Sequence, residues 1–172
     1  MGLSNAIEDL VAAVKATARD ENIVWWFAGD GVFAKDLKAL AETQSNVKFW
    51  GAMPKEEVAK LYAAADVNVV SFAHAQVFYE NSPNKFFDGI AAGLPAVFNR
   101  TTWLEPWLRE YDCGFVCKSP TEIADTLRTI AAMPDSRREG LSRRARRLAE
   151  TVFNCDVLVK KYLDLIAIYR LK

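Results

Sequence analysis

Four short strand-like runs, separated by segments with helical spacing, constrain the fold of this chain most strongly. The runs cover residues 23–29, 47–51, 66–72 and 95–99, and the first two end in glycine. The first of them, "IVWWFAG", is a continuous apolar run, which is typical of a strand that is buried on both faces. Amphipathic segments lie between them, one beginning near Leu3 and the others covering residues 33–44, 54–65 and 83–93.

The rest of the chain continues this pattern with a short helix at 103–111, a strand at 114–117 and helical sequence to the end, including a last helix over 153–172. Strands that alternate with helices at this spacing pair in parallel through right-handed crossovers. We therefore predict an α/β fold, a doubly wound parallel sheet with helices on both faces, and we expect Trp25 and Trp26 to lie in its core. A length of 172 residues suits one domain, and we expect a single domain over residues 1–172.

The charge balance gives no support for nucleic acid as a partner. Lys and Arg total 22 and Asp and Glu total 22, so the net charge is zero. The arginines of "RREGLSRRARRLAE" at 137–150 spread around a helix instead of forming one stripe, which favours a solvated face. This run leaves open a weak association with an anionic membrane surface.

The cysteines indicate a reducing compartment. Cys113, Cys117 and Cys155 are odd in number and lack metal-ligand spacing, and His74 is the only histidine. No stretch reaches the roughly 20 apolar residues that span a bilayer. We therefore expect a cytoplasmic protein without a bound metal, with a peripheral place at the inner membrane face left open.

The loops that follow the strands are the expected site. In doubly wound sheets, ligands bind outside the carboxyl ends of the strands. The loops at 29–31, 51–54, 71–83 and 99–102 should therefore share one rim.

Residues 80–88 contain the densest polar cluster at this predicted rim. A helix beginning near Pro83, with Ser82 or Asn81 as its N-cap, would present the N–H groups of residues 84–86 to an anion. Lys85 adds a positive charge in a first turn where the helix dipole favours an acid, which points to a bound anion. Glu80 and Asp88 suit hydroxyl groups instead. Phosphate together with hydroxyls describes a nucleotide sugar.

Plainer interpretations compete with each of these features. The segment "SPNK" is also a normal capped start of a helix. Gly29 and Gly31 of "GDG" are also consistent with a simple turn, since the third glycine of a dinucleotide fingerprint is missing. His74 is more often solvated than functional in such a loop.

Three segments carry a more specific pattern: "FAGDGVFAKDLKALA", "NVKFWGAMPKEEVAKLYAAADVNVVSF" and "ENSPNKFFDGIAAGLPAVFN". In order, they resemble the C-terminal, donor-binding half of retaining family 4 glycosyltransferases with the GT-B fold. The most specific part is an acid, seven residues and a second acid, here Glu80 and Asp88, followed by "AAGLP". The variant "NSPNKFFD" is similar to members that build bacterial surface polysaccharides.

The resemblance implies roles for individual residues. Glu80 matches the acid that contacts the donor sugar, Asp88 matches the acid that holds the ribose, and Lys85 would cradle phosphate with the helix N-terminus. We therefore expect Glu80 and Lys85 to be catalytic. The expected donor-binding residues are Gly29, Asp30, Gly31, Gly51, Ala52, Met53, Asn81, Ser82, Pro83, Asn84 and Asp88.

The resemblance also implies what lies outside this sequence. Family members carry a first strand and a basic pair just before the position of Gly2, and an N-terminal acceptor-binding domain before that. The first strand is therefore apparently missing, and we expect the isolated chain to be inactive. The substrates would be a nucleotide sugar, UDP-linked, and a glycan or lipid-linked acceptor, with no cofactor.

Two other functions remain in play. The domain is alternatively a non-catalytic binding or assembly module with a vestigial site, which would form a dimer through the exposed sheet edge. An epimerase-like α/β enzyme is disfavoured, because the glycine fingerprint and a Tyr-x-x-x-Lys motif are both lacking.

Overall fold

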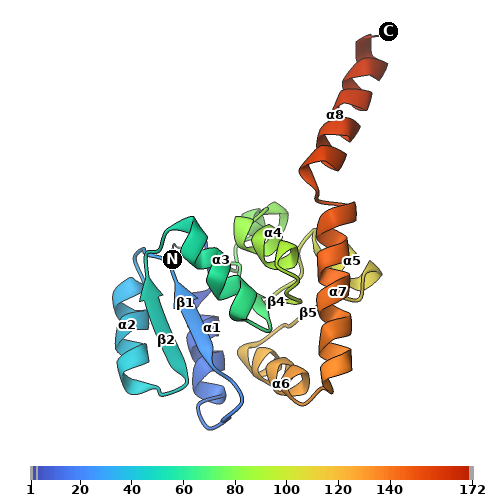
Figure 1. Ribbon diagram of the computed structural model, residues 1–172. Helices are drawn as coiled ribbons and strands as arrows, with labels where there is room; N and C mark the ends of the chain where they lie inside the picture. Colours follow the sequence, from blue (N-terminus) through green and yellow to red (C-terminus); the bar gives the residue numbers. More distant parts are fainter. Residues whose placement is uncertain (1, 3, 171–172) are drawn as a thin grey trace.

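The computed structural model describes residues 2 and 4–170, which form parallel strands flanked by helices (Figure 1). The strands are β1 (Trp25–Ala28), β2 (Val47–Gly51), β3 (Asn68–Val70), β4 (Ala96–Phe98) and β5 (Gly114–Val116). The helices are α1 (Ile7–Ala16), α2 (Ala34–Thr43), α3 (Lys55–Ala64), α4 (Asn84–Ala91), α5 (Glu105–Glu110), α6 (Pro120–Ala131), α7 (Asp135–Thr151) and α8 (Cys155–Arg170), with a 3-10 helix η1 (Gln76–Glu80). The predicted order of elements is confirmed, apart from η1, which lies in a predicted loop.

The strands pair in parallel, as predicted, but within the described residues they form two separate sheets. One contains β1 and β2, with Trp25 opposite Val47. The other has the order β3-β4-β5, with Val70 opposite Phe98 and Phe98 opposite Val116. Between β1 and β3 no ladder connects the two sheets.

Successive residues of β4 lie in two different apolar cores. Val97 packs with α1 and α6 in one core, whereas the next residue, Phe98, packs with α4, α5 and α7 in the other. Successive strand residues point to opposite faces of a sheet, so the two cores lie on its two faces. Helices therefore cover both faces of the β3-β4-β5 sheet, as expected for a doubly wound fold.

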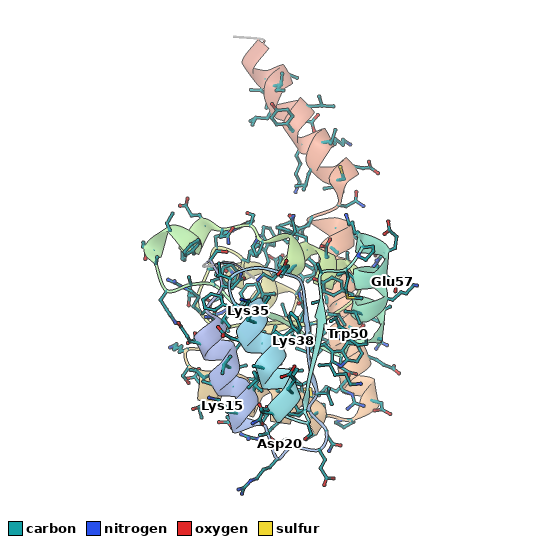
Figure 2. The ribbon with its side chains drawn as sticks, turned by 90° about the vertical axis from the view of Figure 1, so that its left-hand side faces the viewer. Lys15, Asp20, Lys35, Lys38, Trp50 and Glu57 are labelled. Carbon is teal, nitrogen blue, oxygen red and sulfur yellow. The ribbon has the colours of Figure 1, made fainter. Side chains whose placement is uncertain are left out.

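The β1-β2 sheet is covered more unevenly. Helices α1 and α2 line one side, and their lysines Lys15, Lys35 and Lys38 are exposed (Figure 2). Trp25 is buried, but Trp26 is exposed and makes an edge contact with the exposed Trp50 of β2, with ring centroids 6.1 Å apart. The expectation of a core position was therefore wrong for Trp26, because its side chain points away from α1 and α2.

Helix α8 extends away from the rest of the molecule (Figure 1). Its exposed apolar side chains are Leu158, Val159, Tyr162, Leu163, Leu165 and Ile168. It falls within the predicted last helix, whose final positions 171–172 lie outside the described residues. In the described part of the chain, no helix combines the length and the hydrophobicity needed to cross a membrane.

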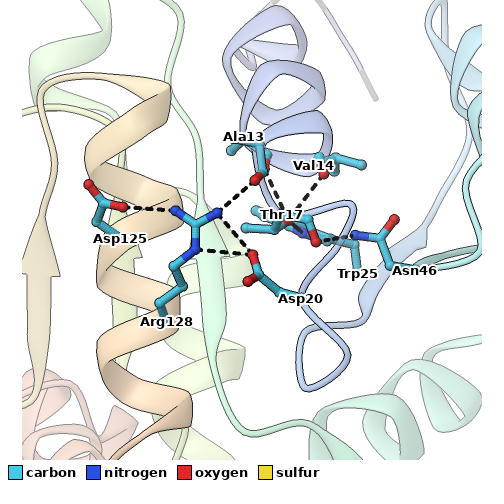
Figure 3. Close-up of polar contacts among 9 residues, drawn as sticks. Ala13, Val14, Thr17, Asp20, Trp25, Asn46, Asp125 and Arg128 are labelled. Carbon is cyan, nitrogen blue, oxygen red and sulfur yellow. Dashed lines mark hydrogen bonds and ion pairs between the residues drawn. The ribbon is translucent and has the colours of Figure 1, made fainter.

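A buried polar contact holds the end of α1 against β1 (Figure 3). The indole N–H of Trp25 donates to the Thr17 hydroxyl at 2.9 Å, and that hydroxyl donates to the C=O of Ala13 at 3.0 Å. The side-chain amide of Asn46, just before β2, donates to the C=O of Thr17 at 3.2 Å. Thr17 therefore connects α1 to both strands of the first sheet.

Replacing Thr17 by valine should remove the acceptor of the buried Trp25 N–H while keeping the shape of the side chain. The unpaired donor should lower the free energy of unfolding by about 1–3 kcal/mol. Urea unfolding measures this change. Thr129→Val is the matched control, since the exposed Thr129 hydroxyl bonds only within α6, and its effect should stay within about 0.5 kcal/mol. Equal effects of the two substitutions would contradict the role of Thr17.

Candidate functional site

One hydrogen bond joins the carboxyl ends of β1 and β2 at the predicted rim. The N–H of Gly29 donates to the C=O of Gly51 at 2.6 Å, so the loops after β1 and β2 lie side by side. Gly29 and Gly51 have φ values of 127° and 68°, a region that side-chain-bearing residues rarely adopt. The Asp30 carboxylate accepts from the N–H of Gly31 at 2.7 Å and so stabilises its own turn.

The start of α4 differs from the prediction. Its N-cap is Pro83, and no side chain caps the helix, so the expected cap by Ser82 or Asn81 is wrong. Asn81 instead accepts the indole N–H of Trp103 at its C=O, at 3.1 Å, which fixes it outside the helix. The N–H of Phe86 donates to the C=O of Pro83, so it is not one of the donors available to a ligand.

Lys85 points inward from this helix start. Its ammonium donates to the side-chain oxygen of Asn5, in the segment before α1. Its backbone C=O accepts from the Asn68 amide at 2.7 Å. Burial lowers the pKa of Lys85 to about 8. Lys85 therefore loses its proton more easily than an exposed lysine does. A negative charge bound beside it would favour its protonated form.

The two acids of the motif lie on the surface around α4. Glu80 is the last residue of η1 and Asp88 lies in the second turn of α4, and both are exposed. Burial, with a contribution from the charge of Asp88, raises the pKa of Tyr62 to about 12. Asp88 therefore lies near α3, whereas Glu80 lies on the loop side of α4.

A cavity of about 950 Å³ lies between β1, α3 and β3 and reaches this rim. Gly29, Met53 and Lys85 line it, so the structure brings together predicted residues from two loops and from the start of α4. The other predicted site residues lie outside its lining: Asp30, Gly31, Gly51, Ala52, Glu80, Asn81, Ser82, Pro83, Asn84 and Asp88. The site is therefore a cavity mouth with a polar surface around the start of α4.

Sequence reasoning missed Asn5, Asn68 and Asp9. Asn5 binds the ammonium of Lys85, and Asn68 binds its backbone C=O. The signal that could have identified Asn68 is its side-chain amide within a predicted strand. Asp9 contacts His74 at 3.0 Å and accepts from the Asn99 amide at 2.9 Å. His74 is largely exposed, as the plainer interpretation expected, but it is paired.

Asn99 fixes the loop that leads to Glu80. Its side chain accepts from the N–H of Phe72 at 2.8 Å and donates to the C=O of the same residue at 3.0 Å. Arg100 donates to the C=O groups of Ala73 and Ala75 at 2.6 and 3.2 Å. Hydrogen bonds from the residues that follow β4 thus hold the loop that follows β3 at the rim.

The described residues show no candidate metal centre. Nowhere among them do three or more His, Cys, Asp or Glu side chains gather closely enough to hold an ion. The positive groups that the structure shows at the site are Lys85 and the N-terminus of α4.

Comparison with known proteins defines the class of this chain. Residues 2–133 match the family model of glycosyl transferases group 1, and the chain belongs to this family. The solved structure of WaaG, a glycosyltransferase involved in lipopolysaccharide biosynthesis, is similar with a TM-score of 0.66 and 22% identity over 86% of this chain and 40% of WaaG. The C-terminal domain of LpcC, a glycosyl transferase group 1 family protein from Francisella tularensis, has a TM-score of 0.67 and 18% identity over 90% of this chain and 84% of that domain.

A third structure, the pneumococcal O-GlcNAc transferase GtfA in complex with UDP and GlcNAc, has a TM-score of 0.59 and 14% identity over 96% of this chain and 33% of GtfA. These likenesses show the Rossmann-like fold of GT-B glycosyltransferases. The chain spans less than half the length of WaaG and GtfA. No curated protein matches its sequence.

Gly89 allows Asn68 to approach α4. A Cβ atom at Gly89 would lie 2.1 Å from the amide nitrogen of Asn68, so Gly89→Ala should displace this side chain from the C=O of Lys85. We expect the free energy of unfolding to fall by about 1–3 kcal/mol, measured by urea unfolding. The matched control is Gly140→Ala in α7, where the Cβ would meet only the flexible end of Arg144, at 3.2 Å. This control should stabilise the protein by up to about 1 kcal/mol. A neutral Gly89→Ala substitution would contradict the packing role of Gly89.

Lys85 should make stability depend on pH. Its pKa is 10.5 when exposed and about 8 when folded, so between these values the unfolded chain binds more protons. The free energy of unfolding should therefore rise with pH across this window, by up to about 3 kcal/mol. Lys85→Met should remove this rise and be the more stable protein below pH 8.

Urea unfolding at pH 7, 8, 9 and 10.5 measures the difference between wild type and variant. Lys55→Met, which removes an exposed lysine from the first turn of α3, should retain the rise. A constant difference between the wild type and Lys85→Met at all pH values would contradict the burial of a charged Lys85.

Proposed function

We propose that this chain is the donor-binding half of a retaining, metal-independent family 4 glycosyltransferase. The complete enzyme transfers a sugar from a nucleoside diphosphate sugar, UDP-linked, to a glycan or lipid-linked acceptor in the synthesis of bacterial surface polysaccharide. Membership of the group 1 glycosyl transferases supports sugar transfer. The observation that carries the proposal is the half-buried Lys85, whose pKa is lowered, at the start of a helix with no side-chain cap.

The start of α4 suits a diphosphate. The N-terminus of a helix carries partial positive charge and free N–H donors, which bind phosphate oxygens. Lys85 lies in the same turn, and its burial makes an unpaired positive charge costly there. A diphosphate leaving group would compensate that charge, and fixed positive groups of this kind stabilise charge that develops as the sugar leaves.

The remaining residues suit the other parts of a nucleotide sugar. The exposed carboxylate of Glu80 would accept hydrogen bonds from the sugar, and that of Asp88 from the ribose. Main-chain groups around the joined ends of β1 and β2 would hold the base. The residues there are Gly29, Asp30, Gly31, Gly51, Ala52 and Met53. The acceptor would bind to an N-terminal domain that this chain does not include, so the isolated chain would bind a donor without turnover.

The location we propose is the cytoplasm, with a peripheral place at the inner membrane face left open. The free cysteines Cys113, Cys117 and Cys155 suit a reducing compartment. Arginines of α7 such as Arg147 are exposed and would meet anionic lipid. No nucleic acid partner is proposed.

UDP binding should be coupled to the protonation of Lys85. At pH 8.5 Lys85 is partly deprotonated, and a bound diphosphate would raise its pKa, so binding should take up protons. Titration calorimetry in two buffers of different ionisation enthalpy measures this uptake. Lys85→Met should abolish the uptake and weaken UDP binding by about tenfold to a hundredfold, the value of a charge-assisted hydrogen bond.

The control is Lys55→Met, which should leave both quantities unchanged. Glu80→Gln tests the sugar separately: it should weaken binding of a UDP-sugar and leave binding of UDP itself unaltered. UDP binding that is equally tight in wild type and Lys85→Met, without proton uptake, would refute the assignment of the phosphate site.

The second candidate function is a non-catalytic assembly module with a vestigial site. The open strand edges between β1 and β3 favour it, since unpaired edges invite association. A stable self-dimer in sedimentation, with no nucleotide raising the melting temperature, would support this function over donor binding.

A further inference from the structure

Strand β2 forms an outer edge of the β1-β2 sheet, since among the described residues it pairs with β1 alone. The C=O of Asn46, just before β2, accepts from the N–H of Trp25 at 2.8 Å and so points toward β1. By alternation, the main-chain groups of Val47 and Phe49 point away from β1. The N–H of Val47 bonds to the C=O of Gln44 within the preceding turn. The edge therefore presents one open donor and one open acceptor, both from Phe49.

The sheet face beside this edge carries exposed aromatic side chains. Phe49 packs against the core under α2, so by alternation Lys48 and Trp50 point to the other face. Trp26 lies next to Lys48 in the register of the sheet and makes its edge contact with Trp50. Trp50 is 45% exposed, and Val24, two residues before Trp26, is 53% exposed. The open edge thus adjoins a patch of three exposed apolar side chains and one exposed lysine (Figure 2).

This edge is complementary to a second copy of itself. Two β2 strands that run antiparallel, with Phe49 on the two-fold axis, would exchange both main-chain bonds of Phe49. In this register Lys48 of each copy lies directly opposite Trp50 of the other, with Cβ atoms roughly 4.5–5.5 Å apart. The ammonium group of Lys48 would then lie between Trp26 of its own chain and Trp50 of the second copy, where cation–π attraction is favourable. The two-fold axis supplies this contact twice.

Charge selects this register over its neighbours. A shift of the strands by two residues in one direction places Lys48 opposite Lys48 of the second copy, and like charges directly opposite each other are destabilising. The reverse shift places Trp50 opposite Trp50 and loses both lysine contacts. A lysine on an edge strand often guards against pairing. Lys48 therefore opposes one register and supports another.

The antiparallel arrangement leaves the candidate site open. The carboxyl ends of the two β2 strands would point in opposite directions, so neither copy would cover the rim of the other. The facing edges of β1 and β3 suit a second copy less well, because they line a cavity that α3 also lines. The β2 edge lies on the outside of the sheet and is free of this restriction.

We propose that β2 forms a two-fold symmetric contact, the β2 edge interface, with a second copy of this chain. The two β1-β2 sheets join there into one four-stranded sheet. Each copy contributes the main chain of Phe49 and the side chains of Trp26, Lys48 and Trp50. The interface is small, so the dimer exchanges with the monomer. The proposal does not rest on donor binding, and a dimer that binds UDP is compatible with the proposed function.

The test uses two variants that share one substitution. Trp50→Lys places lysines opposite each other and should weaken dimerisation at least about tenfold, measured by sedimentation equilibrium over about a hundredfold range of protein concentration. Lys48→Glu combined with Trp50→Lys places opposite charges there and should restore the dissociation constant to within about threefold of the wild-type value. Because both variants contain Trp50→Lys, restoration in the second excludes a folding defect as the cause of dissociation in the first.

Two further measurements locate the contact. Leu165→Lys is the matched control, since Leu165 is an apolar residue of α8 that is 52% exposed, and it should leave dimerisation unchanged. Amide hydrogen exchange measured by NMR should slow at Phe49 by at least about tenfold as the dimer forms. Exchange at Val69, which lines the cavity between β1 and β3, should not depend on protein concentration.

Four results would overturn the proposal. The first is a chain that stays monomeric with rapid exchange at Phe49, which would leave the edge to solvent or to a different protein. The second is dissociation of the dimer by Leu165→Lys, which would locate the contact in α8. The third is concentration-dependent protection at Val69 in place of Phe49. The fourth is a double variant that stays as dissociated as Trp50→Lys, which would exclude the pairing of Lys48 with Trp50.

Discussion

Parallel pairing of the strands is the constraint on which the rest of the structure depends. It brings the ends of β1, β2, β3 and β4 to one rim, so that Gly29 meets Gly51 and Asn99 holds Phe72. It also sends each connection back through a helix, which is why α1, α2 and α6 cover one face and α4, α5 and α7 the other. The polar residues gather at the rim because helices bury both faces.

At the start of α4, packing contacts position the side chain to which we assign phosphate binding, Lys85. Asn68 of β3 holds the backbone of Lys85, Gly89 leaves room for Asn68, and Asn5 holds the ammonium of Lys85. These contacts come from three segments that are distant in sequence. A positively charged group is therefore kept in a half-buried position without an acidic partner among the described residues, which costs stability unless an anion binds. The proposed donor site accounts for this arrangement.

The order of the elements was predictable because each strand and helix carries its own periodicity. The runs at 47–51 and 95–99 match β2 and β4 closely, and parallel pairing followed from the alternation. The local details were less predictable. Ser82 and Asn81 are good N-caps by composition, yet Pro83 takes that position, since the C=O of Asn81 accepts from the distant Trp103. Trp26 has the composition of a core residue, but the face of β1 to which it points is only partly covered.

The sequence alone determined that this chain is an α/β protein with parallel strands, and it located the polar cluster around residues 80–88 at the rim. It did so because hydrophobic period and turn residues are local properties. Only the tertiary structure decided that Lys85 turns inward to Asn5, that Glu80 and Asp88 stay exposed, and that the sheet divides between β1 and β3. These features depend on contacts between distant segments and on which strand edges find partners, and no local pattern encodes either.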